Sequence, residues 1–319
     1  LTSLAVLALV VAFSSATQDI AIDAYRIEAA PAQDQAALSA AYILGYRTAL
    51  LVSGAGALYA AEYLGWVQAY QLMALCGGVG LVTTLLIPRP ALANDEYSPE
   101  VEEAASKWPG LHALFLAPII DFFRRNGRFA VFLLSFIALY RLSDITMGIM
   151  ANPFYLDLGY TKLEIANIAK GLGFALSILG SFLGGVLVVR WGVLITLLIG
   201  GVSVALTNLL FALLALTEPN LVWLALIIGA DNLSGGIAAT SFIAYLSSLT
   251  HTAYTATQYA LFSSLMTLPG KFTSGFSGIA VDAFGYPLFF IGTGVLGVPA
   301  ILMVLYLVYR ERALPADHR

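Results

Sequence analysis

The chain has 319 residues, of which 60% are hydrophobic and 11% are charged, and its formal net charge is −4. A soluble domain is nearer half apolar and a quarter charged. This composition excludes a soluble enzyme, a disordered regulator and a nucleic-acid-binding protein, and it is typical of a membrane protein with several spans.

The residues that most often hold metals are scarce. Cys76 is the single cysteine, which excludes a disulfide framework and a multi-cysteine zinc site. His112, His251 and His318 lie far apart in the sequence and do not have the spacing of metal ligands. We therefore expect no metal and no cofactor.

Long runs without charge predict the membrane spans. No Asp, Glu, Lys or Arg occurs in 1–18, 63–88, 191–217, 232–270 or 283–309. A bilayer core of about 30 Å needs about 20 apolar helical residues, so the run 232–270 must contain a turn. Lipid offers the backbone no hydrogen-bond partners, which favours helices. We expect an all-α protein with about nine transmembrane helices, over 1–24, 39–61, 66–88, 129–152, 164–189, 192–216, 221–249, 255–281 and 286–309.

The basic residues predict the orientation, because they gather in cytoplasmic connections. One set of connections between these spans holds ten of the 15 basic residues, and the opposite set holds only Lys162. The ten are Arg26, Arg89, Lys107, Arg124, Arg125, Arg128, Arg190, Arg310, Arg312 and Arg319. A cytoplasmic C-terminus follows.

The segment 89–128 is the one sizeable polar connection, and it divides the chain into three parts. Residues 1–88 hold three spans, and 129–319 hold six spans and a short cytoplasmic tail. Within 89–128, an acidic stretch at 95–103 reads as a solvated tether. The apolar residues 111–116, followed by Arg124 and Arg125, predict a helix on the cytoplasmic surface.

A weak internal repeat relates the first three spans to the last three. At an offset of 220 residues, Tyr25 matches Tyr245, Glu62 matches Asp282, and Gly65 matches Gly285. Three spans equivalent to 129–216 are then expected to be missing from the front. Two six-helix halves with a long central loop resemble the plan of the major facilitator superfamily, in which the visible spans would be helices 4–12.

Seven ionisable residues fall inside the predicted spans: Asp19, Asp23, Arg47, Arg141, Asp144, Asp231 and Lys271. Facing lipid, they would together cost roughly 20 kcal/mol, which exceeds the net stability of a typical protein. They must therefore pair with one another or face a water-filled cavity.

The acidic members suit proton coupling. Helices 4, 7 and 10 line the central cavity of the superfamily plan. In this chain helix 4 carries Asp19 and Asp23, helix 7 carries Asp144, and helix 10 carries Asp231. Asp19 and Asp23 are four residues apart on one helix face, where mutual repulsion favours a bound proton. Alternatively, Asp23 with Arg26, and Asp144 with Arg141, are ion pairs that only fix the helix register.

The cations Arg47 and Lys271 lie on helices 5 and 11 of that plan, at similar depth in the two halves. They would hold an anionic group of a substrate, or else extend to the interface or pair with a nearby acid. Gly180, Gly184, Gly235 and Gly236 predict close helix packing. Tyr42, Tyr46, Tyr140, Tyr155 and Tyr245 could stack on sugar rings, but a packing or interfacial role is favoured.

Several strings resemble the muropeptide permease (AmpG-type) family along nearly the whole chain. They are Ser14–Arg26, read as SSATQDIAIDAYR, then Gly45-Tyr46-Arg47, Tyr140–Asp144, Asp231–Gly236 and Ala256–Leu261. Two charges differ in kind, because this family often has Lys where Arg141 stands and Glu where Asp231 stands. The superfamily gating motif is incomplete, because Val189 replaces its usual Asp.

The resemblance implies a carrier that imports anhydro-muramyl disaccharide peptides with protons across a bacterial cytoplasmic membrane, for peptidoglycan recycling. Substrate contacts would come from Gln18, Arg47, Arg141, Asn232 and Lys271. No catalytic residue, nucleic acid or obligate protein partner is implied. Acetyl-coenzyme A transporters, or another organic-anion carrier, are the alternative, since they share the Ala-Thr-Gln-Asp string at 16–19.

A membrane-embedded enzyme or sensor is the rival from another class. The sequence has no HExxH motif, no Walker loop and no Gly-x-Ser-x-Gly elbow. Substrate accumulation without chemical change in liposomes would separate a carrier from an enzyme.

The predicted orientation is testable by labelling. We expect a cysteine introduced at Ser98, in a Cys76→Ser background, to react with an impermeant thiol reagent only after spheroplasts are opened, because 89–128 is expected in the cytoplasm. Labelling of intact spheroplasts would refute this topology.

Overall fold

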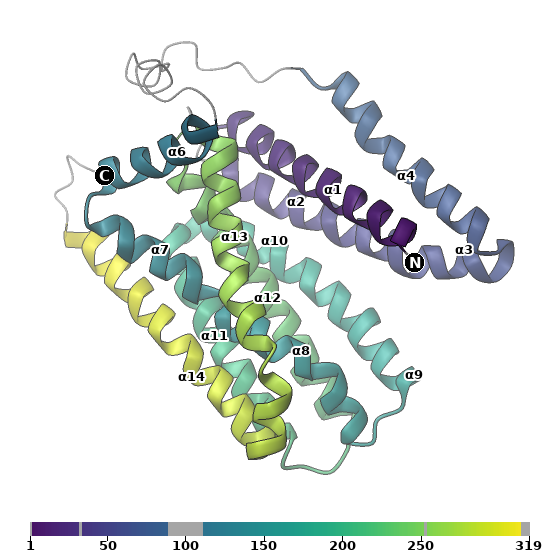
Figure 1. The fold of residues 1–319 in the computed structure, drawn as a ribbon. Helices are drawn as coiled ribbons and strands as arrows, with labels where there is room; N and C mark the ends of the chain where they lie inside the picture. Colours follow the sequence, from purple (N-terminus) through teal and green to yellow (C-terminus); the bar gives the residue numbers. More distant parts are fainter. Residues whose placement is uncertain (1, 32–33, 89–110, 252–253, 314–319) are drawn as a thin grey trace.

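A computed structural model describes residues 2–31, 34–88, 111–251 and 254–313 (Figure 1). All regular structure in these ranges is helical, which confirms the all-α prediction for this part of the chain. Two short π-helical turns, η2 (Val52–Gly56) and η3 (Ala166–Leu172), join α2 to α3 and α9 to α10. The helices are α1 (Thr2–Glu28), α2 (Gln35–Leu51), α3 (Ala57–Leu64), α4 (Trp66–Leu86), α6 (Leu111–Asn126), α7 (Phe129–Tyr140), α8 (Leu142–Asp157), α9 (Lys162–Ile165), α10 (Gly173–Trp191), α11 (Val193–Leu214), α12 (Leu221–Leu249), α13 (Thr255–Ser274) and α14 (Ser277–Ala313).

Eight helical stretches in the described ranges are long and apolar enough to cross a membrane. They agree with eight of the nine predicted spans, and α12 has the predicted bounds of 221–249. The predicted span 255–281 instead divides at Gly275, since α13 ends at Ser274 and the following residues belong to α14. With 20 residues, α13 has the length of a span, but its hydroxyl side chains and Lys271 make it less apolar.

Helices α7, α8 and α10–α14 form a bundle around two groups of buried aromatic side chains. Phe136, Tyr140 and Phe242 lie in one group, and Phe154 and Phe290 in the other. Edge contacts between rings, such as Phe136 against Phe242 at 5.9 Å, fill each group with large apolar surfaces. Helices α1 and α2 lie against one side of this bundle, with α2 on α10 and α12 and α1 on α13 (Figure 1).

Glycines allow α10 and α12 to approach closely. A Cβ on Gly180 would lie 2.2 Å from the carbonyl oxygen of Leu233, and one on Gly236 would lie 2.5 Å from that of Ser177. The predicted packing role is thus confirmed for these two glycines and for Gly184, which faces Ile237. It is wrong for Gly235, where an added Cβ would meet no atom within 4 Å.

The backbone repeats one sharp bend at three glycines. Gly65 (φ 88°, ψ 162°) and Gly285 (φ 75°, ψ 165°), which the 220-residue offset pairs, adopt nearly the same conformation. Gly192, between α10 and α11, has φ 85° and ψ 164°. This region of backbone space is essentially restricted to glycine. The shared conformation supports the internal repeat and adds a third copy that the sequence comparison did not include.

Residues 111–126 are helical, as α6, in the segment where a surface helix was predicted, and the acidic stretch before it lies outside the described residues. Its C-terminal half is tied to α13, because the Gln258 side-chain amide donates to Asp121 Oδ2 at 2.9 Å and accepts from Arg125 at 3.2 Å. The Gln258 amide also donates to the carbonyl oxygen of Pro118 at 2.9 Å.

The close helix contact gives a matched pair of stability predictions. We expect Gly236→Ala to destabilise the fold by about 1–3 kcal/mol, because the new methyl group would overlap the α10 backbone. Gly235→Ala should preserve or raise stability, since alanine is favoured in helices by about 1 kcal/mol. Thermal unfolding of the purified protein in detergent measures both, and equal unfolding temperatures would contradict the packing analysis.

Candidate functional site

Four of the seven charged residues predicted inside the spans, Arg47, Arg141, Asp144 and Asp231, line one cavity of about 300 Å³. Three elements surround it: α2, the junction of α7 and α8, and α12. Its lining residues are Tyr42, Ile43, Tyr46, Arg47, Arg141, Asp144, Asp231, Asn232, Gly235, Ala239 and Ile243. We call this cavity the charged pocket. Its volume is at the small end of the range for ligand sites.

One wall of the charged pocket is an ion pair at a helix junction. Helix α7 ends at Tyr140, and Arg141 has φ −95° and ψ 0° before α8 begins. Arg141 Nη2 lies 2.5 Å from Asp144 Oδ2, which confirms the predicted i,i+3 pair. Both side chains remain 25% exposed. The pair is therefore accessible to a ligand and is not sealed in the protein core.

Arg47 supplies the second cation from α2. Within the described part of the chain, no carboxylate lies within 4.0 Å of its guanidinium, in contrast to Arg141. It points into the same pocket as Arg141, Asp144 and Asp231. A guanidinium without a protein counter-ion is the group in this pocket best suited to bind a carboxylate from solution.

Asp231 and Asn232 supply the α12 wall. Thr207 Oγ1 on α11 lies 3.1 Å from Asp231 Oδ1 and can donate to it, although this hydroxyl also lies 2.9 Å from the carbonyl oxygen of Val204. The Asn232 amide donates to the carbonyl oxygen of Ile228 at 2.9 Å. Asp231 is thus oriented by a neutral hydroxyl, and Asn232 keeps its amide oxygen for another partner.

Four predicted site residues do not line the charged pocket. Gln18 points toward α4, since a Cβ on Gly80 would lie 3.0 Å from its Nε2. Asp19 is exposed on α1, and Lys271 is exposed on α13. Asp23 is buried in an ion pair with Arg26, with Nη2 3.6 Å from Oδ1. The predicted symmetry between Arg47 and Lys271 is therefore absent from this pocket.

Two of the five tyrosines considered for stacking, Tyr42 and Tyr46, lie on α2. They are four residues apart and both line the charged pocket. Tyr140, Tyr155 and Tyr245 are buried among aromatic side chains, which confirms the packing role for them. Tyr42, Tyr46 and Arg47 form a Tyr-x-x-x-Tyr-Arg string. This spacing is the sequence signal that could have predicted which face of α2 lines the pocket.

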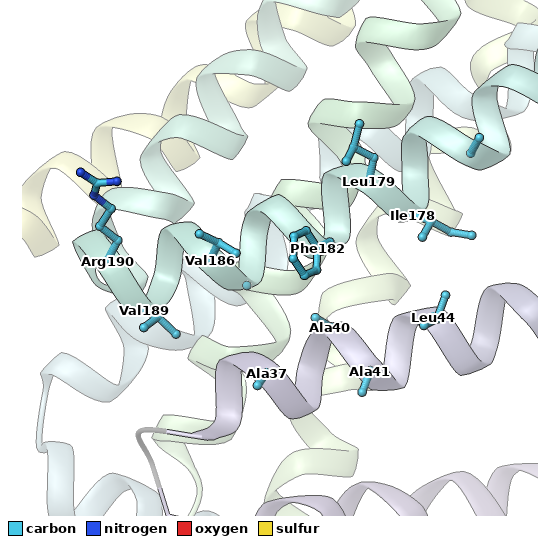
Figure 2. A pocket seen from close by; sticks show the side chains of 12 residues that line it. Ala37, Ala40, Ala41, Leu44, Ile178, Leu179, Phe182, Val186, Val189 and Arg190 are labelled. Carbon is cyan, nitrogen blue, oxygen red and sulfur yellow. The ribbon is translucent and has the colours of Figure 1, made fainter.

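A larger cavity, of about 780 Å³, lies between α2 and α10 (Figure 2). Ala37, Ala40 and Ala41 face Phe182 and Val186 across it, and Arg190 is its one charged wall. Such a surface offers dispersion contacts but few hydrogen bonds. We therefore place the candidate site at the smaller charged pocket, where cations, carboxylates and an amide converge.

Comparison with known proteins identifies the family. Residues 1–274 match the Major Facilitator Superfamily. The chain is 35% identical over 309 residues to "Putative transporter AmpG 4" of Rickettsia felis, which covers 96% of this chain and 73% of that protein. It is 33% identical over 304 residues to "Anhydromuropeptide permease" of Escherichia coli K12, covering 95% of this chain and 59% of that protein. The chain belongs to the AmpG-type family of the major facilitator superfamily.

This assignment confirms the resemblance drawn from the sequence motifs and the predicted fold class. The chain is a multi-pass membrane protein of a transporter family. No cluster of three or more metal-ligating side chains occurs among residues 2–31, 34–88, 111–251 and 254–313.

Proposed function

We propose that this protein imports muropeptides, that is anhydro-muramyl disaccharide peptides, across the bacterial cytoplasmic membrane by proton symport, for peptidoglycan recycling. The family assignment and the name of the Escherichia coli relative support the substrate class. The alternative, an acetyl-coenzyme A carrier, has no support from the names of the relatives compared above.

The observation that carries the proposal is Arg47 in the charged pocket. A peptide carboxylate would provide the counter-ion that this cation lacks in the described structure. Arg141 can take part by exchanging its bond to Asp144 for one to the ligand, and Asn232 can accept or donate a hydrogen bond. Gln18 and Lys271 stay in the proposal as residues of another stage of transport.

Four carboxylates are proposed for proton coupling. Asp144 and Asp231 line the charged pocket, so protonation there changes the charge that a ligand meets. Asp23 is paired with Arg26, and Asp19 lies one helical turn before it on α1. When the substrate anion leaves its cation and the proton leaves its carboxylate, both groups would regain the charge that they had before binding.

The proposed arrangement in the membrane follows the sequence analysis. Residues 1–88 and 129–319 form two halves that move relative to each other, 89–128 lies in the cytoplasm, and so does the C-terminus. The ends of α1, α12 and α14 and the start of α13 would then lie on the cytoplasmic side. The lipid bilayer, protons and a small-molecule substrate are the expected partners.

Reconstitution tests the function directly. With an inward proton gradient, proteoliposomes should accumulate labelled N-acetylglucosaminyl-anhydro-muramyl peptide, and the recovered label should be chemically unchanged. Collapse of the gradient should reduce accumulation to equilibrium. A changed product would indicate an enzyme, and accumulation that ignores the gradient would contradict proton symport.

The coupling proposal predicts a split between two transport modes. Asp→Asn at Asp19, Asp23, Asp144 or Asp231 should reduce gradient-driven accumulation more than substrate exchange, since exchange requires no net proton movement. Accumulation and exchange are measured in the same proteoliposome preparation. If all four variants keep full accumulation, these carboxylates do not carry the coupling.

Arg47 should bind a carboxylate of the substrate. Arg47→Gln should weaken muropeptide binding by about 30-fold or more, since loss of a partly desolvated cation costs roughly 2–5 kcal/mol. An analogue with amidated peptide carboxylates should lose much less affinity on the same substitution. Equal losses, measured by titration calorimetry, would mean that Arg47 has only a structural role.

A further inference from the structure

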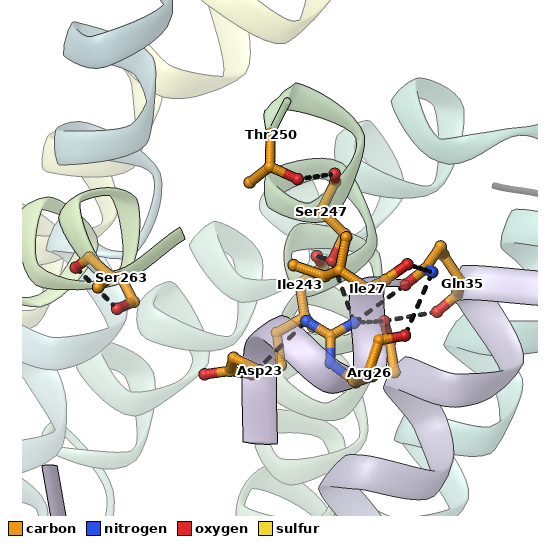
Figure 3. Close-up of polar contacts among 10 residues, drawn as sticks. Asp23, Arg26, Ile27, Gln35, Ile243, Ser247, Thr250 and Ser263 are labelled. Carbon is orange, nitrogen blue, oxygen red and sulfur yellow. Dashed lines mark hydrogen bonds and ion pairs between the residues drawn. The ribbon is translucent and has the colours of Figure 1, made fainter. Parts of the chain in front are cut away.

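Arg26, in the last turn of α1, is a buried cation outside the charged pocket. Several contacts of its guanidinium come from residues 1–88, the same half of the chain as Arg26 itself (Figure 3). Nη1 donates to Gln35 Oε1 at 3.3 Å and to Ser39 Oγ at 3.4 Å, both on α2. The carboxylate of Asp23 lies 3.6 Å from Nη2. These contacts hold the side chain at the start of α2.

The same guanidinium also contacts the other half. Nη1 donates to Ser247 Oγ on α12 at 3.0 Å, the shortest of its three hydrogen bonds. The Tyr259 ring on α13 lies 5.2 Å from the guanidinium carbon, and the Tyr42 ring on α2 lies 5.6 Å from it. Both distances fall within the range of cation–π attraction. We call Arg26 and these partners the Arg26 cluster.

The Arg26 cluster lies one helical turn beyond the charged pocket. On α2, Ser39 precedes the pocket residue Ile43 by four residues, and on α12 Ser247 follows the pocket residue Ile243 by four. Four residues of helix measure about 6 Å. Tyr42 belongs to both, since it lines the pocket and contacts Arg26. The cluster therefore forms the floor of the pocket at the end where α1 ends.

The bonding of Arg26 is incomplete, which suits a contact that must break. Nε and Nη2 have no hydrogen-bond partner, and neither has Asp23 Oδ1. A buried donor without a partner opposes the closed arrangement, whereas Ser247 and Tyr259 favour it.

We propose that the Arg26 cluster is the closure of the pocket at this end, and that it opens when Arg26 releases Ser247 and Tyr259 while keeping Asp23, Gln35 and Ser39. The contacts that close it are thus the hydrogen bond to Ser247 and the side chain of Tyr259, through its ring and its hydroxyl. The closure needs only that the two halves separate, so it can be tested without a substrate and stands apart from the muropeptide assignment.

Thiol accessibility tests the closure in the whole chain. In a Cys76→Ser background, a cysteine at Ala239, on the α12 wall of the pocket, reports entry of an impermeant thiol reagent added on the side where α1 ends. We expect Arg26→Gln to raise the reaction rate about tenfold. Ser247→Ala and Tyr259→Leu, which leave the Arg26 charge in place, should raise it about threefold each.

Two controls separate closure from general loosening. Tyr259→Phe keeps the ring and removes only the hydroxyl that interacts with Arg26, so it should raise the rate less than Tyr259→Leu does. Arg310→Gln removes an arginine whose guanidinium carbon lies 3.8 Å from the Phe129 ring, a contact within 129–319, and it should leave the rate unchanged.

Unchanged rates in Arg26→Gln, Ser247→Ala and Tyr259→Leu would overturn the proposal, and so would an equal rise in Arg310→Gln. Ser247→Ala keeps the test valid if Arg26→Gln fails to fold. Failure of muropeptide uptake, with these rates as expected, would affect the proposed substrate and not the closure.

Discussion

A guanidinium between membrane helices needs acceptors and negative charge from the protein, because lipid supplies neither. Arg26 meets this requirement with partners from α1, α2, α12 and α13 at once. The position of α1 and α2 against α12 and α13 at this end therefore depends on the surroundings of one charge.

The charges of the charged pocket also need partners from the protein, but not all of them are paired. Two arginines and two aspartates line it, so its formal charge sums to zero, yet only Arg141 and Asp144 form an ion pair. Arg47 and Asp231 remain as a separated cation and carboxylate on opposite helices. If the pocket binds the substrate as proposed, Arg47 and Asp231 would attract it at two points without the desolvation cost of breaking two ion pairs.

The sequence predicted where the helices lie along the chain, but it did not predict which side of each helix faces the pocket. Charge-free runs located the spans, and i,i+3 spacing predicted the pairs of Arg26 with Asp23 and Arg141 with Asp144. Gln18 and Lys271 do not line the pocket, because the order of apolar and polar residues in a membrane helix does not by itself show which face turns toward a cavity. The bond from Arg26 to Ser247 joins residues 221 positions apart, and only the packed helices bring them together.

The three glycine bends join consecutive helical segments without a loop between them. At Gly65, Gly192 and Gly285 the next helical segment starts at once, so the two segments on either side of each bend behave as one rigid hairpin. If the two halves separate at the Arg26 cluster as proposed, the absence of a loop at these bends means that a displacement of one segment passes directly to the next. Opening at one end of the helices would then be transmitted to the other end.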